Sequence, residues 1–471
     1  MMRCIASPKG RGFGPALGSS SLLRVRIVMS LWLLLSLALG LGAMAARLEA
    51  QAPDDVLSDD TAETQAIPGA GELAEGDAEG MDQVDIYLHT IDVGNMIYDN
   101  FGHTAIRVVD HRNGTDLVYN WGMFSFDDGP VTFALDFYKG HLIYRLGVYP
   151  FRAVLRGYEH DTRTVWEDKI NLNAEEKAIL LKRLAWNNKP ENRPYSYQYF
   201  FDNCSTRPRN YIDEALGGDL NELYSNTLSN KTFRDFVMEG YQSDPGMDVL
   251  LDFGMNSNLD RFATSWETMF HPLYLRSLLL EYSANKRVLL SDGHVLVERK
   301  RPDAYPKLAY SLLLLVGGLP LIPLAILMFL QQNREEPSRL LYRLFGLISS
   351  IWLGFGAFFG FLMAISWAVS EHLDLHHNAS MMLFWPTDIY VFGLAFGILI
   401  KGRPVRFHPG GWYFARIYLI AHIVVSLLLP CLRILGVIAQ NVDRVSVYLL
   451  PPYLAILLML LRVGVKPKQT M

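Results

Sequence analysis

The chain has 471 residues, of which 50% are hydrophobic and only 19% are charged. This balance is too apolar for a single soluble domain, so we expect membrane-spanning segments. The formal net charge of −5 is small, which argues against a nucleic-acid partner. The length leaves room for two or three domains.

Residues 1–46 have the pattern of an export signal. Arg24 and Arg26 precede an apolar run from Leu31 to Leu41, and Ala43-Met44-Ala45 forms a cleavage site of small residues. An uncleaved anchor helix is the alternative interpretation, and Met29 is an alternative start. In either case the next segment is delivered outside the cytoplasm.

Residues 47–83 are rich in Asp, Glu, Ala and Gly and contain no aromatic residue. This composition predicts a disordered acidic linker. The hydrophilic segment that follows, residues 84–305, is the part in which we expect a catalytic domain. Its first part alternates like β-strands, and we predict strands at Val84–Thr90, Thr104–Val109 and Leu117–Trp121, with a turn at Asn113-Gly114.

Two helices are predicted further along this segment. The first is Ala174–Asn187, which Asn173 can cap, and the second is Thr206–Leu216, which Gly217-Gly218 closes. Strands mixed with segregated helices predict an α+β domain. The apolar face of the first helix is expected to contain Ile179, Leu180, Leu184 and Trp186.

Residues 306–471 have the composition of a membrane domain. A spanning helix needs about 20 apolar residues, and five stretches approach that length. We therefore expect an all-α bundle of five transmembrane helices at Leu308–Leu330, Leu344–Val369, Met381–Ile400, Trp412–Leu435 and Ser446–Val463.

The basic residues of this region lie in alternate loops. Arg334 and Arg343 lie between the first two stretches and Lys466 follows the last, whereas Ser370–Ser380 contains no Lys or Arg. The positive-inside rule then places the C-terminus in the cytoplasm and residues 84–305 on the opposite side of the membrane.

Cysteine usage draws attention to Cys204. Cys4 lies in the leader and Cys431 in the fourth apolar stretch, so the outer domain has one thiol and no internal disulfide. Asp202 or Asn203 could cap the helix that follows, and its unpaired amides would favour a thiolate at Cys204. A buried structural cysteine is the alternative.

A thiolate nucleophile needs a base, and His103 at the start of the second predicted strand is our candidate. Gly102 before it allows close approach of backbone or substrate. Asn120, on the next strand, is the candidate that orients the imidazole. A lone histidine is more often an ordinary surface or core residue, so the pairing with Cys204 carries the hypothesis.

The loop Ser370–Ser380 is crowded with ionisable residues. Three interpretations stay open: the loop borders the active site, with His372 and His376 contacting the substrate; it binds a metal; or it is an ordinary polar interfacial loop. We expect neither a metal nor another cofactor. Asp388, inside the third apolar stretch, also stands out, because ionisable residues are costly within membranes and often functional. The alternative is that Asp388, near the outer end of the stretch, simply reaches water.

Three motifs resemble one family. Phe101-Gly102-His103-Thr104-Ala105, Tyr119-Asn120-Trp121-Gly122 and Asp202-Asn203-Cys204-Ser205-Thr206-Arg207 are similar to the periplasmic domain of the Lnb-type bacterial lipoprotein N-acyltransferases. The order of His103 before Cys204 also resembles the circularly permuted papain-like group, to which the NlpC/P60-related enzymes belong. The resemblance implies a permuted papain-like (NlpC/P60-like) fold for the outer domain. It also implies that this domain lies in the periplasm and that the chain is a bacterial inner-membrane protein.

The resemblance also implies a reaction. Cys204 would take an acyl chain from a membrane phospholipid as a thioester and pass it to the N-terminal amine of a diacylglyceryl-cysteine lipoprotein, with His103 moving the protons. Arg207 would contact the phosphate or the oxyanion, although an arginine on a helix face is more often a salt-bridge partner. We expect a monomer. The alternatives are a membrane-tethered cysteine hydrolase or amidase of the cell wall, and a non-enzymatic envelope lipid-binding factor.

Overall fold

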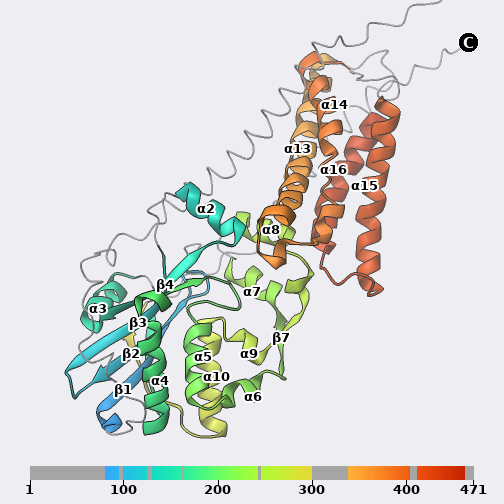
Figure 1. Ribbon diagram of the computed structural model, residues 1–471. Helices are drawn as coiled ribbons and strands as arrows, with labels where there is room; N and C mark the ends of the chain where they lie inside the picture. Colours follow the sequence, from blue (N-terminus) through green and yellow to red (C-terminus); the bar gives the residue numbers. More distant parts are fainter. Residues whose placement is uncertain are drawn as a thin grey trace, which may run out of the picture.

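The computed structural model describes residues 80–94, 99–124, 130–161, 163–241, 245–299, 338–403 and 411–461. These residues form a mixed α/β domain followed by a helical region (Figure 1). The predicted signal, nearly all of the predicted linker and the apolar stretch Leu308–Leu330 lie outside the described residues. The folded domain begins slightly before the predicted boundary, because Met81–Gln83 form a 3-10 turn (η1) whose Met81 is buried.

The α/β domain is built on a seven-stranded antiparallel sheet. Its strand order is β6-β4-β3-β2-β1-β5-β9, which places the first strand near the middle. All three predicted strands are present, each extended by one to four residues. The strands are β1 (Val84–Ile91), β2 (His103–Asp110), β3 (Thr115–Met123), β4 (Ile143–Pro150), β5 (Val165–Ile170), β6 (Pro194–Ser196) and β9 (Leu290–Val297).

Helices cover both faces of the sheet. On one face α4 (Ala174–Asn187), α5 (Thr206–Ala215) and α10 (Pro272–Asn285) enclose a core that includes the fully buried Trp121 and Ile106. Each such side chain contributes about 1.5–3 kcal/mol by leaving water. On the other face α3 (Phe151–His160) packs over a smaller core. The buried Asn187 joins the first layer together, because its Oδ1 accepts hydrogen bonds from Trp121 and Tyr211.

The two predicted helices are confirmed. Asn173 and Glu176 form a capping box at the start of α4, as the sequence indicated. The predicted apolar face is only half right: Leu180 and Leu184 are buried, but Ile179 and Trp186 are exposed. The ring of Trp186 instead lies under the Arg183 guanidinium, 4.3 Å from it.

The chain on both sides of α5 forms a second layer rich in aromatic residues. Phe200, Phe233, Phe236 and Phe270 are its buried centre. The remaining elements here are η2 (Pro190–Asn192), α6 (Asp219–Tyr224), β7 (Leu228–Thr232), α7 (Phe233–Gly240), α8 (Pro245–Gly254), η3 (Ser257–Asp260), β8 (Phe262–Thr264) and α9 (Ser265–Thr268).

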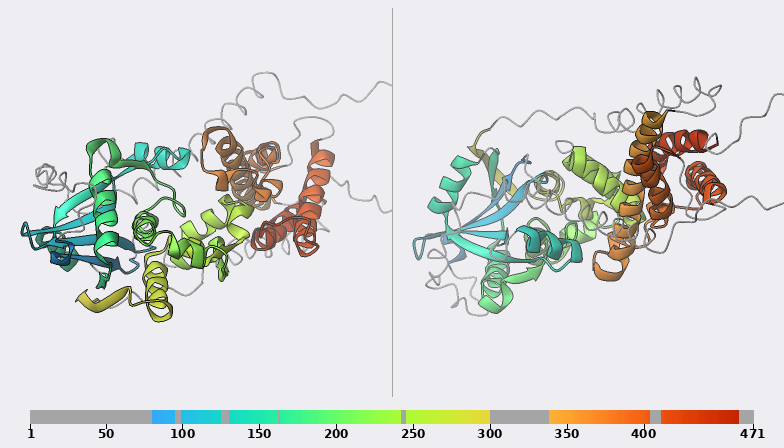
Figure 2. Two further views of the ribbon diagram at one scale, coloured as in Figure 1. Left: turned by 60° about the horizontal axis from the view of Figure 1, so that its bottom comes forward. Right: turned by 90° about the horizontal axis from the view of Figure 1, so that it is seen from above.

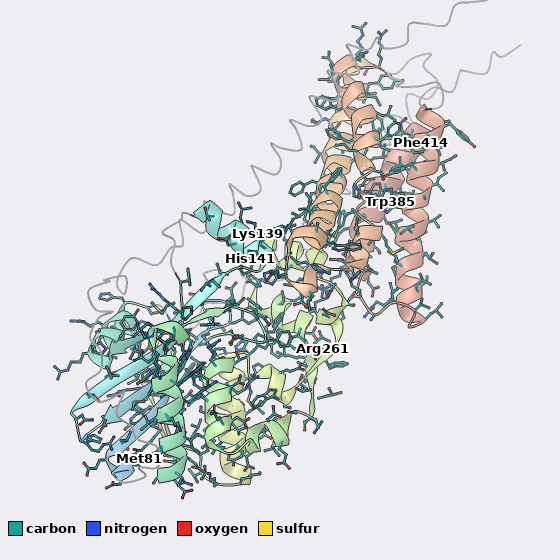
Figure 3. The ribbon with its side chains drawn as sticks, viewed as in Figure 1. Met81, Lys139, His141, Arg261, Trp385 and Phe414 are labelled. Atoms are coloured by element: carbon teal, nitrogen blue, oxygen red, sulfur yellow. The ribbon has the colours of Figure 1, made fainter. Side chains whose placement is uncertain are left out.

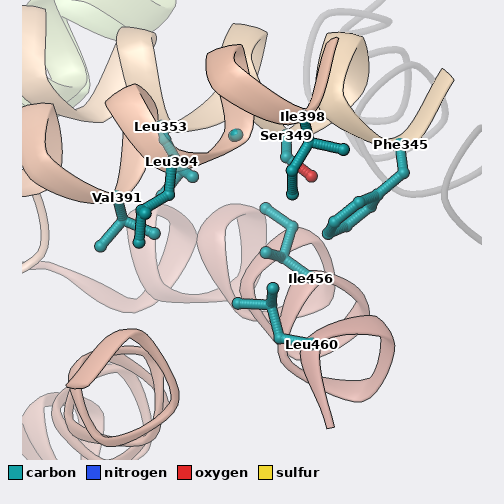
Figure 4. Close-up of a pocket in the computed structure, with 9 residues that line it drawn as sticks. Phe345, Ser349, Leu353, Val391, Leu394, Ile398, Ile456 and Leu460 are labelled. Carbon is teal, nitrogen blue, oxygen red and sulfur yellow. The ribbon is translucent and has the colours of Figure 1, made fainter. Parts of the chain in front are cut away.

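The described part of the helical region consists of two helix pairs. α13 (Arg339–Val369) packs against α14 (Asp388–Lys401), and α15 (Gly411–Ile434) packs against α16 (Asp443–Leu460), as Figure 2 shows. Among the described residues, three helices are long and apolar enough to cross a membrane: α13, residues 413–434 of α15, and α16. A small apolar hollow between α13, α14 and α16 is lined by Phe345, Val391 and Ile456, among others (Figure 4).

The predicted span Met381–Ile400 is wrong in its first third. After η4 (Leu373–Leu375) and η5 (Ala379–Met382), the backbone stays non-helical until α14 begins at Asp388. Pro386 explains the late start, because the residue before a proline is disfavoured in helical conformation. This irregular segment packs directly on α13, where a Cβ on Gly360 would lie 2.5 Å from the carbonyl oxygen of Phe384.

Among the described residues, the α/β domain contacts the helical region at two places. At the first, α2 (Pro130–Lys139) lies against the end of α13, and the Tyr138 hydroxyl donates to the Leu362 carbonyl at 3.0 Å. Lys139 and His141 mark this junction in Figure 3. At the second, Phe253 of α8 packs among aromatic rings of the helical region, including Phe384 at 5.4 Å. The C-terminal end of α2, with the residues just after it, therefore lies beside the domain-facing end of α13.

Candidate active site

His103 is the first residue of β2, and a glycine precedes it for a steric reason. Gly102 has a φ of +78°, and a Cβ there would lie 2.4 Å from the carbonyl oxygen of Ile91. The imidazole Nε2 donates to the Oδ1 of Asn120 at 2.5 Å, on the neighbouring strand β3. This bond favours the tautomer in which Nε2 carries the proton. Nδ1 then carries the free lone pair that a base requires.

Cys204 lies in the turn immediately before α5. Its neighbour Asn203 holds this turn: Oδ1 accepts the backbone N–H groups of Ser205 and Thr206, both at 2.8 Å. The Asn203 amide group also donates to the carbonyls of Tyr199 and Phe270. The N-cap position of α5 is Ser205, which makes no side-chain cap hydrogen bond, so the predicted cap at Asp202 or Asn203 was placed too early. The Asn203 bonds lie in the turn before the helix, where they fix the backbone of the adjoining cysteine.

Gly122 brings the histidine and the cysteine together. It has a φ of +96°, and a Cβ there would lie 3.5 Å from His103 Cε1 and 3.6 Å from Cys204 Cβ. The regular pairing of β2 with β3 ends at the pair Ala105 and Asn120. The backbone N–H of Thr104, the residue before Ala105, donates to the Cys204 sulfur. Within the described residues no direct hydrogen bond joins the His103 imidazole to that sulfur.

Comparison with known proteins gives this domain a family. Residues 79–234 match the family described as the Lnb N-terminal periplasmic domain. This segment is an Lnb domain. Neither a curated protein nor a solved structure matched the chain. The Lnb domain and the three apolar helices make the chain a membrane protein with a periplasmic domain, related to lipoprotein modification.

Burial decides the protonation of the pair in the Lnb domain. Burial raises the pKa of Cys204 to about 11, although the amides of Thr104 and Cys204 and the charge of Arg163 oppose the shift. Burial also lowers the pKa of His103 to about 4, against the hydrogen bond to Asn120. Both shifts favour a thiol and a neutral imidazole over the thiolate that the helix start by itself predicts.

Tyrosines form one wall beside Cys204. The rings of Tyr144 and Tyr197 stack at 4.3 Å, and Tyr144 Cδ1 would lie 3.9 Å from a Cβ on Gly122. Tyr195 pairs with Tyr144 across β6 and β4 and is nearly buried. The sequence reasoning missed this wall, although Tyr195, Tyr197 and Tyr199 alternate with the period of a strand.

Arg163 is a second feature that sequence reasoning missed. Its guanidinium is held by Asp161 and lies 3.9 Å from a carboxylate oxygen of Asp99. Its charge lowers the pKa of both His103 and Cys204. No motif in the sequence signals this residue, because it reaches the site from the loop before β5.

Arg207 has the salt-bridge role that was the alternative interpretation. Its guanidinium donates to both oxygens of Asp202, at 2.7 and 2.8 Å, and stacks over the ring of Tyr195 at 3.8 Å. These contacts brace the Cys204 turn against the tyrosine wall. The three predicted catalytic residues and Arg207 thus lie in one region of the Lnb domain.

His372 and His376 are placed elsewhere, at the junction of the two domains. His372 Nε2 donates to the carbonyl of Phe137 at 2.7 Å, and His376 Nε2 donates to the carbonyl of Ser370 at 2.8 Å. No contact in the described part of the chain joins either histidine to Cys204 or His103. In the same part, no group of three or more His, Cys, Asp or Glu side chains could hold a metal ion.

Proposed function

We propose that this chain is a lipoprotein N-acyltransferase in which Cys204 carries the acyl group. The observation that carries the proposal is the meeting of His103 and Cys204 on either side of Gly122, with Asn120 bonded to the imidazole. A nucleophile, a base and an orienting group are the parts that Cys-His acyl transfer requires. Membership of residues 79–234 in the Lnb family supports the substrate class.

The neutral pair suggests how the first step proceeds. When the ester carbonyl of a phospholipid approaches, the thiol proton passes to Nδ1 of His103 as the sulfur forms its bond to the carbonyl carbon. The amides of Thr104 and Cys204, which point at the sulfur, would stabilise the oxyanion. The intermediate then expels the lysophospholipid alkoxide, which takes the proton from His103, and a thioester remains on Cys204.

The second step runs through the same groups in reverse order. The uncharged N-terminal amine of the diacylglyceryl-cysteine lipoprotein attacks the thioester, and His103 accepts one of its protons. The Cys204 thiolate leaves and regains that proton from His103, while the acyl chain ends as an amide. No oxidant, metal or other cofactor is needed for the balance of atoms and electrons.

Closeness to the membrane supports lipid substrates. Gly140 packs on the loop after α13, since a Cβ there would lie 3.2 Å from Glu371 Cβ, whereas Tyr144 borders Gly122 and Cys204. The four Cα–Cα steps from Gly140 to Tyr144 span at most about 14 Å. A lipid in the outer leaflet would need to rise only that far to reach the thiol.

The topology is part of the proposal. We take the Lnb domain to lie in the periplasm, the five apolar stretches to cross the inner membrane with the C-terminus in the cytoplasm, and the α/β domain to have the permuted papain-like topology. We also propose that His372 and His376 hold the loop Ser370–Ser380 in place rather than contact substrate. We further propose that the protein acts as a monomer.

The test is direct. Membranes with the wild-type chain, Cys204→Ser or His103→Ala receive phospholipid with a labelled acyl chain, and lipoproteins are analysed by mass spectrometry. The proposal requires that only the wild-type chain forms a labelled thioester on Cys204 and yields labelled N-acylated lipoprotein. Wild-type N-acylation in either variant, or turnover of cell-wall peptide without acyl transfer, would reject it.

A further inference from the structure

A buried carboxylate lies inside the helical region, far from Cys204. Asp388 is the first residue of α14 and has no exposed surface. Its Oδ1 accepts hydrogen bonds from the Tyr418 hydroxyl and His422 Nε2, both at 2.8 Å, and its Oδ2 accepts one from the Tyr453 hydroxyl at 3.0 Å. Asp388 therefore links α14 to both members of the second helix pair.

This cluster lies deep in the bundle. His422 stands twelve residues before the end of α15, and Tyr453 stands ten residues after the start of α16. At about 1.5 Å per residue, these positions are about 15–18 Å from the domain-facing ends of the two helices. That is near the middle of a hydrocarbon core about 30 Å thick, where ionisable side chains generally have a functional reason.

The histidine of the cluster has an unused nitrogen. Its ring lies between those of Trp385, at 3.9 Å, and Tyr453, at 4.5 Å; Figure 3 labels Trp385 inside the bundle. Because Nε2 donates to Asp388, Nδ1 is left as an acceptor, and it has no partner among the described residues. A fully buried imidazole nitrogen without a partner is rare in native proteins.

Further polar groups continue from this nitrogen toward the α/β domain. The buried Ser426 hydroxyl, one turn along α15, also lacks a partner within the described chain, and Pro430 has no N–H to bond the Ser426 carbonyl. On α16 the buried Ser446 hydroxyl likewise has no hydrogen-bond partner among the described residues. Ser446 lies on the same helix face as Tyr453. These groups line one seam between α15 and α16.

The seam ends at a buried polar cluster near the α/β domain. Gln440 Nε2 donates to Asn378 Oδ1 at 2.8 Å and to Ser380 Oγ at 3.2 Å, and all three residues are buried. Gln440, Ser446, Ser426 and His422 thus form a file, a row of hydrogen-bonding groups spaced by one or two helical turns. A small ligand that donates hydrogen bonds and needs two to four polar partners fits such a file, and water is that ligand.

We propose that the seam between α15 and α16 is a water-binding site that connects the Asp388–His422 pair with the domain-facing side of the membrane. The pair can then exchange protons with that side through the file. This site is separate from the chemistry at Cys204 and does not depend on the proposed acyl transfer.

Cysteine accessibility tests the proposal. In a full-length chain with Cys4, Cys204 and Cys431 replaced by serine or alanine, Ser426→Cys and Ser446→Cys are introduced singly. Proteoliposomes are treated with methanethiosulfonate ethylammonium, which reacts with ionised thiols and therefore requires water. Two controls match them: Leu429→Cys, buried on α15, and Ser350→Cys, a buried serine on α13 whose hydroxyl already donates to Gly346.

We expect both seam cysteines to react at least tenfold faster than both controls. If one seam variant fails to insert, the other still decides, since each sits on a different helix. Seam cysteines that react no faster than Leu429→Cys would overturn the proposal. So would faster reaction only when an impermeant reagent is added on the side opposite the α/β domain.

Discussion

His103 and Asn120 are joined by a hydrogen bond of 2.5 Å between neighbouring strands; Asn120 belongs to the last regular β2–β3 pair, with Ala105, and His103 lies two residues before Ala105. The bond favours the tautomer in which Nε2 carries the proton, and that tautomer leaves Nδ1 as the base. It also holds the ring next to Gly122, which Cys204 borders from the other side.

Replacing Asn120 by alanine should lower the rate of N-acylation about 100-fold or more, because an unoriented imidazole samples the wrong tautomer and rotamer. The rate is measured with labelled phospholipid in membranes. Asn120→Asp keeps the acceptor for Nε2 and should retain much more activity than Asn120→Ala. Equal activity in the alanine variant and the wild type would contradict the orienting role.

The reactivity of Cys204 should rise steadily with pH. Since burial raises the pKa of the thiol to about 11, the thiolate fraction grows about tenfold per pH unit through neutrality. In a chain without Cys4 and Cys431, alkylation by iodoacetamide without substrate should therefore climb from pH 7 to pH 9.5 with no plateau. A plateau near pH 7 would mean a stabilised thiolate instead.

His103 should make stability fall as the solution becomes acidic. Its pKa is lowered to about 4 by burial, so between pH 6.5 and pH 4 the unfolded chain binds a proton that the folded chain excludes. Stability is therefore full above pH 6.5 and is lost progressively as pH falls toward 4. In denaturant unfolding, His103→Gln should show a weaker loss over this range than the wild type.

Gly122→Ala should damage catalysis more than folding. A non-glycine residue at this positive φ costs about 1–2 kcal/mol, and its methyl group would touch both His103 and Cys204. The matched control is Gly114→Ala, which has a φ of +63° and nothing within 4 Å of the new methyl group. Both variants should lose similar stability, but only Gly122→Ala should lose most of its activity.

Asn256 should be important for the docking of α8 on the loop after α13. Its buried Nδ2 donates to the carbonyls of Leu373 and His376, so Asn256→Ala leaves both acceptors unpaired at a cost of about 1–3 kcal/mol. The exposed neighbour Asn258, with one bond to Asp374, is the control and should cost little. Thermal unfolding and proteolysis near residues 245–260 measure the difference.

Local features could be predicted because their causes are local. The alternation of Val84–Thr90 is enough to indicate a strand, and Asn173 with Glu176 is enough to start α4. His103 and Cys204 could be proposed from residue type and position in their elements. Their meeting could not, since it depends on Gly122 and on the packing of β2, β3 and α5.

The sequence by itself determined the domain order, the first three strands, the two predicted helices and the residues able to carry thiol chemistry. Only the tertiary structure decided that burial raises the pKa of Cys204, that Arg207 is bound to Asp202, and that Asp388 has three buried partners. The physical reason is that desolvation and hydrogen bonding depend on groups that the fold brings together from distant parts of the chain. Helix dipole and capping, which act within one turn, are outweighed at Cys204 by that burial.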